Sequence, residues 1–152
     1  MTISGEMPKW RRVVHRCASG FMFLFFAVFA VYGARLFFMG SVAGRGKGPA
    51  VAMMLWFTFL AAFAIGMQRW YDRRMIAQFS FDGSLLRFTT LGNEETQARD
   101  LSEIVQVREW RGRGGPLGYR LDFRDGAKAY LQYSVTNATA LGEQLRFRVG
   151  LS

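Results

Sequence analysis

Two long apolar runs dominate the first half of the chain. Residues 17–34 are 18 consecutive positions without a charged side chain, and residues 48–68 are 21 such positions. An α-helix rises about 1.5 Å per residue, so roughly 20 apolar residues cross the hydrocarbon core of a bilayer. The pattern therefore predicts a two-helix transmembrane hairpin over residues 17–68, with an external loop at about residues 40–48.

The second half of the chain changes to an alternation of apolar and polar residues, which is the period of half-buried strands. Asp-Gly pairs at residues 82–83 and 125–126 and a glycine-rich segment at 112–118 separate the runs and are typical of turns. Residues 101–103 form a corner between two further runs. We expect about six antiparallel strands between residues 76 and 133.

The last segment returns to a helical period. Four apolar residues recur there at three- and four-residue spacing: Ala138, Leu141, Leu145 and Val149. Thr136 or Asn137 can cap the first turn, and Gly142 weakens the helix by roughly 1 kcal/mol relative to alanine. Because such a helix can cover an open end of the strands, residues 69–152 are predicted to form a small α+β domain.

The order of these elements resembles that of the bacterial pleckstrin-homology-like (PH-like) domains. The matching segments are Phe79 to Leu86 around the Asp-Gly turn, residues 101–107, and the helix after Tyr133. Many members of that family are similar to this chain over its whole length, with a two-span hairpin followed by the domain. The resemblance implies an antiparallel strand barrel or sandwich capped by the C-terminal helix, and a binding or assembly role without catalysis. In lipid-binding relatives a long basic loop between the first two strands holds the headgroup, whereas here we expect that loop to be only residues 82–83.

Charge is distributed unevenly between the two halves. Residues 1–74 contain ten Lys/Arg and two acids, a net charge of +8, and residues 75–152 contain ten Lys/Arg and nine acids, a net charge of +1. The excess of basic residues flanks the apolar runs, so it fits membrane orientation better than nucleic-acid binding. We therefore expect a lipid bilayer and no nucleic acid among the partners.

The basic residues also predict the orientation of the hairpin. Seven cations lie within 1–16 and 69–74, against three around the intervening loop. Lysine and arginine are enriched on the cytoplasmic side, so we expect a multi-pass protein of the bacterial cytoplasmic (inner) membrane with both termini in the cytoplasm and 1–16 as a basic N-terminal segment. A signal peptide is the alternative for the first run, but the run is longer than usual and Arg35 interrupts it before the weak cleavage pattern at residues 41–43.

Two further sets of residues are predicted to serve the hairpin. Four side chains are expected to anchor it at the membrane interfaces: Trp10, Arg35, Trp70 and Tyr71. Four small residues are expected to pack the two helices together as small-xxx-small pairs: Ala30 with Ala34, and Ala62 with Gly66. The first run also holds many phenylalanines, which face lipid or a larger membrane complex.

Groups able to carry out chemistry are few. His15 and Cys17 are the only histidine and cysteine, and two ligands do not complete a zinc site, which takes three or four. The nine acids of the second half show no spacing that indicates a general acid and base. We expect no enzyme activity, no metal and no cofactor, and no small-molecule substrate is evident.

One polar constellation surrounds the glycine-rich segment. It comprises five residues: Arg108, Trp110, Arg111, Arg113 and Arg120. Arginine and tryptophan are frequent anchors of protein interfaces, and arginines beside a membrane attract anionic headgroups. A solvated loop balanced by Glu109 and Asp122 is the alternative interpretation.

Two functions follow from these patterns. The first is a non-catalytic accessory, scaffold or assembly subunit, whose hairpin packs against a membrane-protein partner or a second copy and whose domain docks on the partner. The alternative is a membrane-tethered sensor or binder of anionic lipid headgroups. A transporter or an enzyme is a weak third possibility, since two spans form no pathway unless they oligomerise.

Overall fold

The computed structural model describes residues 2–42 and 48–150, which divide into two compact units. One unit is Val13–Trp70, and the other combines Met1–Arg12 with Tyr71–Ser152. The N-terminal residues therefore belong to the same folded body as the second half of the chain. This corrects the prediction that residues 1–16 form a separate basic segment.

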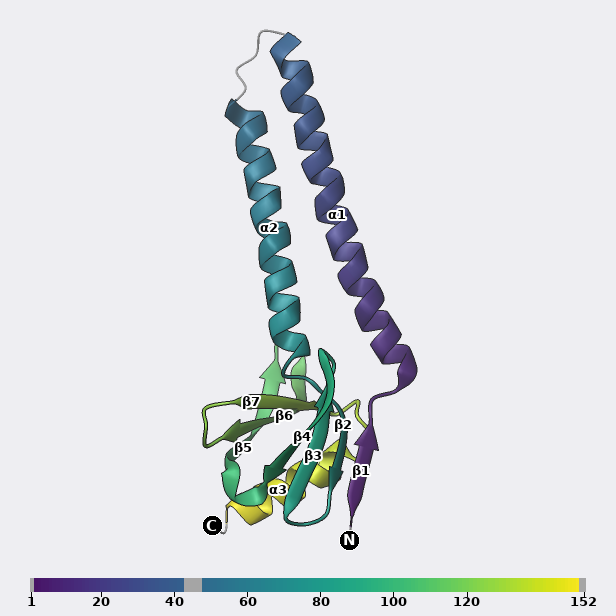
Figure 1. Cartoon of the computed structure of the whole chain (residues 1–152), viewed down its shortest axis with the longest axis vertical. Helices are drawn as coiled ribbons and strands as arrows, with labels where there is room; N and C mark the ends of the chain where they lie inside the picture. The colour runs from purple at the N-terminus through teal and green to yellow at the C-terminus, as the bar shows by residue number, and fades with distance from the viewer. Residues whose placement is uncertain (1, 43–47, 151–152) are drawn as a thin grey trace. The chain divides into compact units, whose positions relative to one another are not determined.

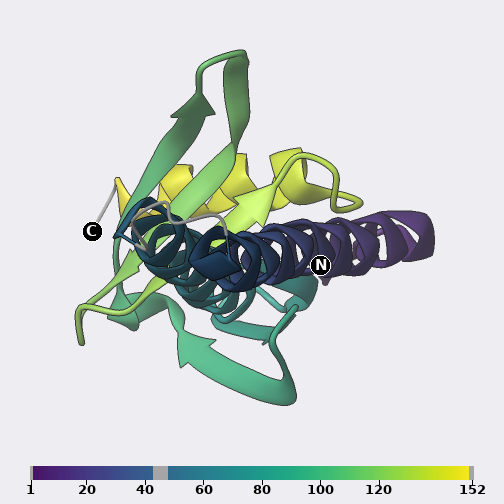
Figure 2. The same cartoon turned by 90° about the horizontal axis from the view of Figure 1, so that it is seen from above.

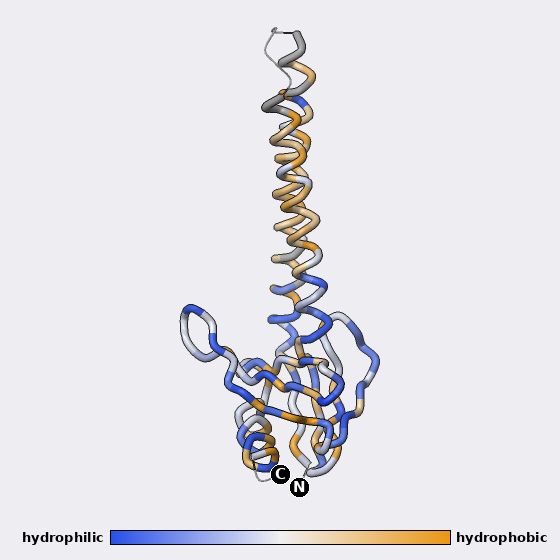
Figure 3. The backbone as a smooth tube through the Cα atoms, turned by 90° about the vertical axis from the view of Figure 1, so that its left-hand side faces the viewer, coloured by the Kyte–Doolittle hydropathy of each residue, from blue (hydrophilic) through white to orange (hydrophobic). Residues whose placement is uncertain are grey.

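Two long helices occupy the first unit. Helix α1 covers Lys9–Val42 and helix α2 covers Gly48–Asp72. Both are long and apolar enough to cross a membrane, and almost none of the residues in their apolar windows is buried. Figure 3 shows both helices largely in the hydrophobic colours, whereas the second half of the chain mixes hydrophobic and hydrophilic positions. Of the predicted external loop, residues 43–47 lie outside the described residues.

The two helices pack against each other at Gly33, which is buried. A Cβ atom on Gly33 would lie 2.9 Å from Cγ of Met54. One turn away, the rings of Phe29 and Phe57 stack with their centroids 4.9 Å apart. The helices therefore meet through aromatic and methionine side chains packed against one glycine.

Only one of the two predicted small-residue pairs lies at this contact. Ala30 and Ala34 are half-buried, but Ala62 and Gly66 are exposed, and a Cβ atom on Gly66 would meet nothing within 4 Å. Between Met53 and Gln68 the half-buried positions of α2 follow a different stripe: Met53, Met54, Phe57, Leu60, Ala61, Ala64, Ile65 and Gln68. Because successive residues of an α-helix are rotated by about 100°, a pair one position off this stripe misses the contact. The prediction for the second pair is wrong.

The second unit contains two antiparallel sheets. The first has four strands in the order β1 (Ile3–Glu6), β2 (Ile76–Phe81), β3 (Leu85–Thr90) and β4 (Asn93–Asp100). The 3-10 helix η1 (Leu101–Glu103) leads to the second sheet, with β5 (Ile104–Gly112), β6 (Gly115–Phe123) and β7 (Lys128–Gln132). Helix α3 (Ala138–Val149) ends the unit (Figures 1 and 2). The α+β layout is as predicted, with one strand more than expected.

That additional strand is β1, which the sequence pattern does not predict. It pairs antiparallel with β2, from Ile3 opposite Phe81 to Glu6 opposite Gln78. Its four residues are too few to show a period, and their partner is far away along the chain. The two long helices are therefore inserted between the first and second strands of the domain.

A glycine allows β1 to pack this closely. A Cβ atom on Gly5 would overlap the carbonyl oxygen of Thr136 and the ring of Phe79. Thr136 itself donates its backbone N–H and its hydroxyl to the carbonyl oxygen of Glu6, each at 3.2 Å. Strand β1 thus lies between β2 and the segment that leads into α3.

The turns of the domain depend on carboxylates and on positive φ angles. The carboxylate of Asp82 accepts the backbone N–H groups of Ser84 and Leu85 at 3.0 and 2.9 Å, and Gly83 has φ +108°. Both bonds lower the pKa of the Asp82 carboxyl, and the bond from Leu85 has the larger effect. The Asp-Gly hairpin is confirmed. The glycine-rich segment differs from its prediction as a loop, because β5 and β6 continue through most of it and leave a tight turn at residues 113–114.

Helix α3 closes the core with the predicted stripe. Leu141 and Leu145 are fully buried, and a Cβ atom on Gly142 would overlap the ring of Tyr119 on β6. The capping prediction is wrong in detail. Asn137 occupies the N-cap with φ +57° but makes no side-chain cap bond, and its amide instead donates to the carbonyl oxygen of Ser4 at 2.8 Å.

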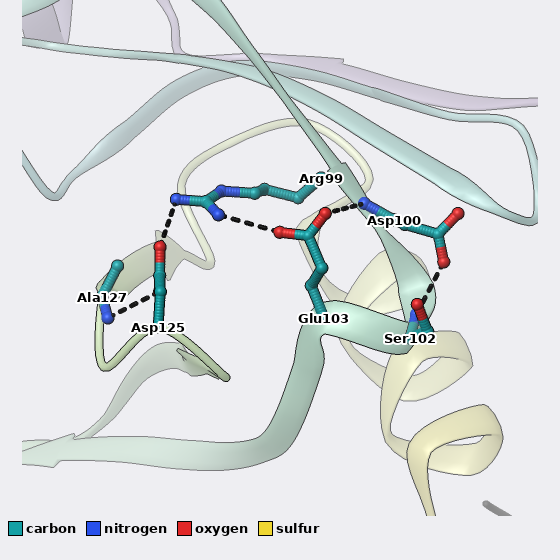
Figure 4. Close-up of polar contacts among 6 residues, drawn as sticks. All are labelled: Arg99, Asp100, Ser102, Glu103, Asp125 and Ala127. Carbon is teal, nitrogen blue, oxygen red and sulfur yellow. Dashed lines mark hydrogen bonds and ion pairs between the residues drawn. The ribbon is translucent and has the colours of Figure 1, made fainter.

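An ion-pair network joins β4 to the other sheet (Figure 4). The guanidinium of Arg99 donates to Glu103 at 2.8 Å and to Asp125 at 2.7 Å. The bond from Arg99 holds the pKa of Glu103 below its usual range, with the N–H of Asp100 contributing. The pKa of Asp125 is also lowered, first by the hydrogen bond from the N–H of Ala127 and then by the bond from Arg99. One arginine therefore links β4, η1 and the β6–β7 turn.

The close contact at Gly142 gives a prediction opposite to helix propensity. Alanine normally stabilises a helix relative to glycine, but here the added methyl group must displace the Tyr119 ring. We expect Gly142→Ala to destabilise the domain by about 1–3 kcal/mol, measured by thermal unfolding of the full chain in mild detergent. Glu143→Ala, on the exposed side of α3, should leave the midpoint nearly unchanged; a raised midpoint for Gly142→Ala would show that Tyr119 does not pack there.

The Arg99 network predicts a pH dependence of stability. The pKa values of Glu103 and Asp125 are lower in the folded chain than in the unfolded chain, so their stabilisation is complete above the unfolded values and is lost as the pH falls through the folded values. Arg99→Met should melt earlier than the wild type at pH 7, and the difference should shrink below about pH 4. Arg124→Met is the control, because Arg124 is an exposed arginine in the β6–β7 turn beside Asp125. A difference independent of pH would contradict this assignment.

Candidate functional site

The β5–β7 sheet presents one face away from the core, called here the outer face. Its three rows follow from the strand register: Gln106, Asp122 and Lys128; Arg108, Arg120 and Tyr130; Trp110, Gly118 and Gln132. The alternate positions, such as Val107, Leu121 and Ala129, are buried in the core. Because side chains alternate along a strand, this face collects three of the five residues of the predicted constellation.

Three aromatic rings form a cluster on the outer face. The centroids of Trp110 and Tyr130 are 5.1 Å apart, and Tyr71, from the last turn of α2, lies 6.1 Å from Trp110 and 6.3 Å from Tyr130. Strands β5 and β7 flank β6 and are therefore about 9–10 Å apart, so this contact has to pass over β6. Gly118, opposite Trp110, has no side chain in the way, and a Cβ atom there would overlap the carbonyl oxygen of Leu131.

The cations of the outer face are unequally compensated. Arg120 donates through Nε and Nη2 to one oxygen of Asp122, at 3.2 and 2.8 Å. Arg108, directly opposite Arg120, is exposed and has no ion pair among the described residues. Like charges facing each other across strands are destabilising. With Lys128 included, the outer face carries three cations and one acid, so its net charge is positive.

The other two arginines of the predicted constellation lie elsewhere. Arg111 forms an ion pair with Glu109 at 2.6 Å, and the Tyr133 hydroxyl donates to the same carboxylate at 3.3 Å. Arg111 follows Trp110 directly on β5, so its side chain lies on the opposite side of the strand from the outer face. Arg113 is exposed in the turn at the end of the hairpin. Alternation along β5 is enough to separate Arg111 from Arg108, but residues 112–118 were predicted as a loop, so Arg113 and Arg120 could not be assigned to a face.

The surroundings of Glu109 and Tyr133 shift the pKa values of both groups. The bond from Arg111 lowers the pKa of the Glu109 carboxyl. Burial, followed by the hydrogen bond with Tyr119, raises the pKa of Tyr133 to about 12. Tyr133 therefore stays protonated and serves as a hydrogen-bond donor at physiological pH.

The predicted interface anchors fall into both units. Trp10 and Trp70 are exposed, and the guanidinium of Arg11 lies 5.2 Å from the centre of the Trp10 ring. Arg35 is exposed on α1. Tyr71, in contrast, is half-buried in the aromatic cluster, so its contacts within the domain account for it.

His15 and Cys17 do not act together. The side chain of His15 hydrogen-bonds with that of Gln68 across the two long helices, and Cys17 is exposed. Within residues 2–42 and 48–150, no group of three or more His, Cys, Asp or Glu side chains is placed to hold a metal ion. The outer face therefore remains the candidate site.

Comparison with known proteins adds no family to these observations. No model of a known protein family matches the chain, and a search among characterised proteins finds no significant relative. The resemblance to PH-like domains therefore depends on the residues and on the order of the strands.

The outer face predicts different roles for Trp110 and Arg108. Trp110 packs against the core as well as against two rings, so Trp110→Ala should lower the stability of the domain by about 2 kcal/mol. Arg108→Gln should change stability by less than about 0.5 kcal/mol, as expected at an exposed position. Thermal unfolding of both full-length variants checks this. Equal stability of Trp110→Ala and the wild type would contradict the packing role.

Proposed function

We propose that this protein is a non-catalytic integral membrane protein that acts as an accessory, scaffold or assembly subunit. In this proposal the two long helices cross a bacterial inner membrane, both termini lie in the cytoplasm, and the β-sheet unit is a cytoplasmic PH-like domain. The domain docks on a partner protein or on a second copy. Its outer face, with Arg108 at the centre, contacts an acidic segment of that partner.

The observation that carries the proposal is the pairing of β1 with β2. Only Met7 and Pro8 separate β1 from the start of α1, and Arg12 in the first turns of α1 forms an ion pair with Glu6 at 2.8 Å. After α2, the carbonyl oxygen of Arg74 accepts the N–H of Tyr130 at 2.8 Å. Both ends of the helix pair are thus attached to one folded body. This supports the placement of both termini on one side of the membrane.

The arrangement of strands supports the PH-like part of the proposal. Four strands, three strands and a final helix are compatible with the capped barrel or sandwich that the resemblance implies. The resemblance implies a hairpin that precedes the domain in the sequence, whereas here the first strand of the domain precedes the two helices. With β1 included, the connection between the first two strands is the helix pair itself. The short loop at residues 82–83 follows the second strand and not the first. Its length therefore no longer bears on the comparison with the headgroup-binding loop of lipid-binding relatives, which lies between the first two strands.

The surface of the helices supports a role in a larger assembly. Large aromatic side chains are exposed on both: Phe21, Phe23, Phe25 and Phe38 on α1, and Trp56, Phe59 and Phe63 on α2. Part of this surface suits lipid. An aromatic surface of this extent on two helices also offers area to the helices of a partner.

Site-specific photo-crosslinking of the full chain in native membranes tests this function. A photoreactive phenylalanine analogue at Arg108 should give a discrete protein adduct, of a partner or of a second copy. The same analogue at Thr139, exposed on α3, should not. Arg120→Glu, which reverses one of the three cations of the outer face, should lower the adduct yield several-fold, because charge complementarity then weakens.

The same experiment distinguishes the lipid-sensor alternative. One observation favours that alternative, namely that Arg108 is an exposed cation without an ion pair in the described part of the chain. If mass spectrometry shows only phospholipid adducts at position 108, and the protein migrates as a monomer in mild detergent, the scaffold proposal is wrong. Labelling of residue 149 from outside intact cells would refute the proposed orientation.

A further inference from the structure

A crevice of about 200 Å³ lies between α1 and α2. Six apolar side chains line it: Met22, Phe23, Phe26, Ala61, Ala64 and Ile65. The two alanines leave the space that larger residues would fill. All the lining residues belong to the unit Val13–Trp70, so the crevice is a property of the helix pair.

One end of this crevice is polar. Gln68 and Arg69 complete its lining, and Gln68 hydrogen-bonds with His15 on the other helix. Arg69 is exposed and has no ion pair among residues 2–42 and 48–150. An apolar wall therefore ends at an uncompensated cation next to a hydrogen-bonded polar pair.

We propose that this crevice binds one phospholipid with an anionic headgroup. The lipid lays an acyl chain along Ala61 and Ala64 and places its phosphate beside Arg69. Apolar surface favours the chain, and a cation near the membrane surface attracts anionic headgroups. This inference rests on the proposed membrane location of the helices, but not on the accessory role or on the outer face.

The size of the crevice argues for a lipid chain rather than another helix. An α-helix with its side chains is about 10–12 Å across, which is more than a crevice of 200 Å³ can seat. An acyl chain is narrow and flexible and can enter between Phe23 and Ala61. The charge at Arg69 then distinguishes an anionic lipid from a zwitterionic lipid with the same chains.

Native mass spectrometry of the full-length protein tests this inference. The protein in mild detergent is titrated with phosphatidylglycerol or phosphatidylcholine of identical acyl chains. We expect a single phosphatidylglycerol adduct, formed with about fivefold preference over phosphatidylcholine, the factor expected for one cation near the surface. Arg69→Gln should remove the preference, whereas Arg35→Gln, an exposed cation on α1 outside the crevice, should keep it.

A matched pair of variants tests the apolar part of the site. Ala64→Phe fills the crevice and should abolish the adduct, while Ala62→Phe, two residues away on the exposed surface, should retain it. Equal binding of the two lipids by the wild type, or equal loss in both phenylalanine variants, would overturn the inference. A dimer abolished by Ala64→Phe would instead indicate a second copy at this position. Crosslinking at Arg108 is a separate readout, so failure of the proposed accessory role would be recognised independently.

Discussion

The burial of one stripe of α3 is the interaction on which the rest of the domain depends. Two sheets of four and three strands each have an apolar face, and neither can be stable while that face meets water. Leu141 and Leu145 enter the space between the sheets and are fully buried. Helix α3 contacts strands of both sheets, so a single helix converts two half-covered sheets into one core. Because α3 is packed this tightly, position 142 has no room for a side chain larger than that of glycine.

The candidate site likewise contains two kinds of residue, those that contribute to packing and those that contribute mainly charge. The aromatic cluster on the outer face is held by packing, and its tryptophan is also a neighbour of the core. The arginines around it carry charge at the surface and contribute little to packing. Such a division lets the charged positions differ between related proteins without loss of the fold.

The sequence predicted those features that depend on neighbouring residues. The two uncharged runs, the Asp-Gly turn at residues 82–83 and the stripe that includes Leu141 are local patterns, and the structure contains all three. Strand β1 was missed because its partner lies beyond both helices. Ala62 was misplaced because the phase of one helix against another is a property of their packing. Alternation along β5 places Arg108 and Arg111 on different faces, whereas Arg120 could not be assigned to the face of Arg108 without the pairing of β5 with β6.

The position of β1 has a consequence for how the protein is made. Ile3 pairs with Phe81, so the first strand emerges from the ribosome long before its partner. Both long helices have to be synthesised in the interval. If they enter the membrane during synthesis, β1 can join the sheet only when the N-terminus has stayed on the side where the domain folds. A chain in which only one of the two helices crosses the membrane would hold β1 and β2 on opposite sides, which would leave the edge of β2 bare and Phe79 exposed. Completion of the sheet would then separate correctly inserted chains from those that quality-control proteases remove.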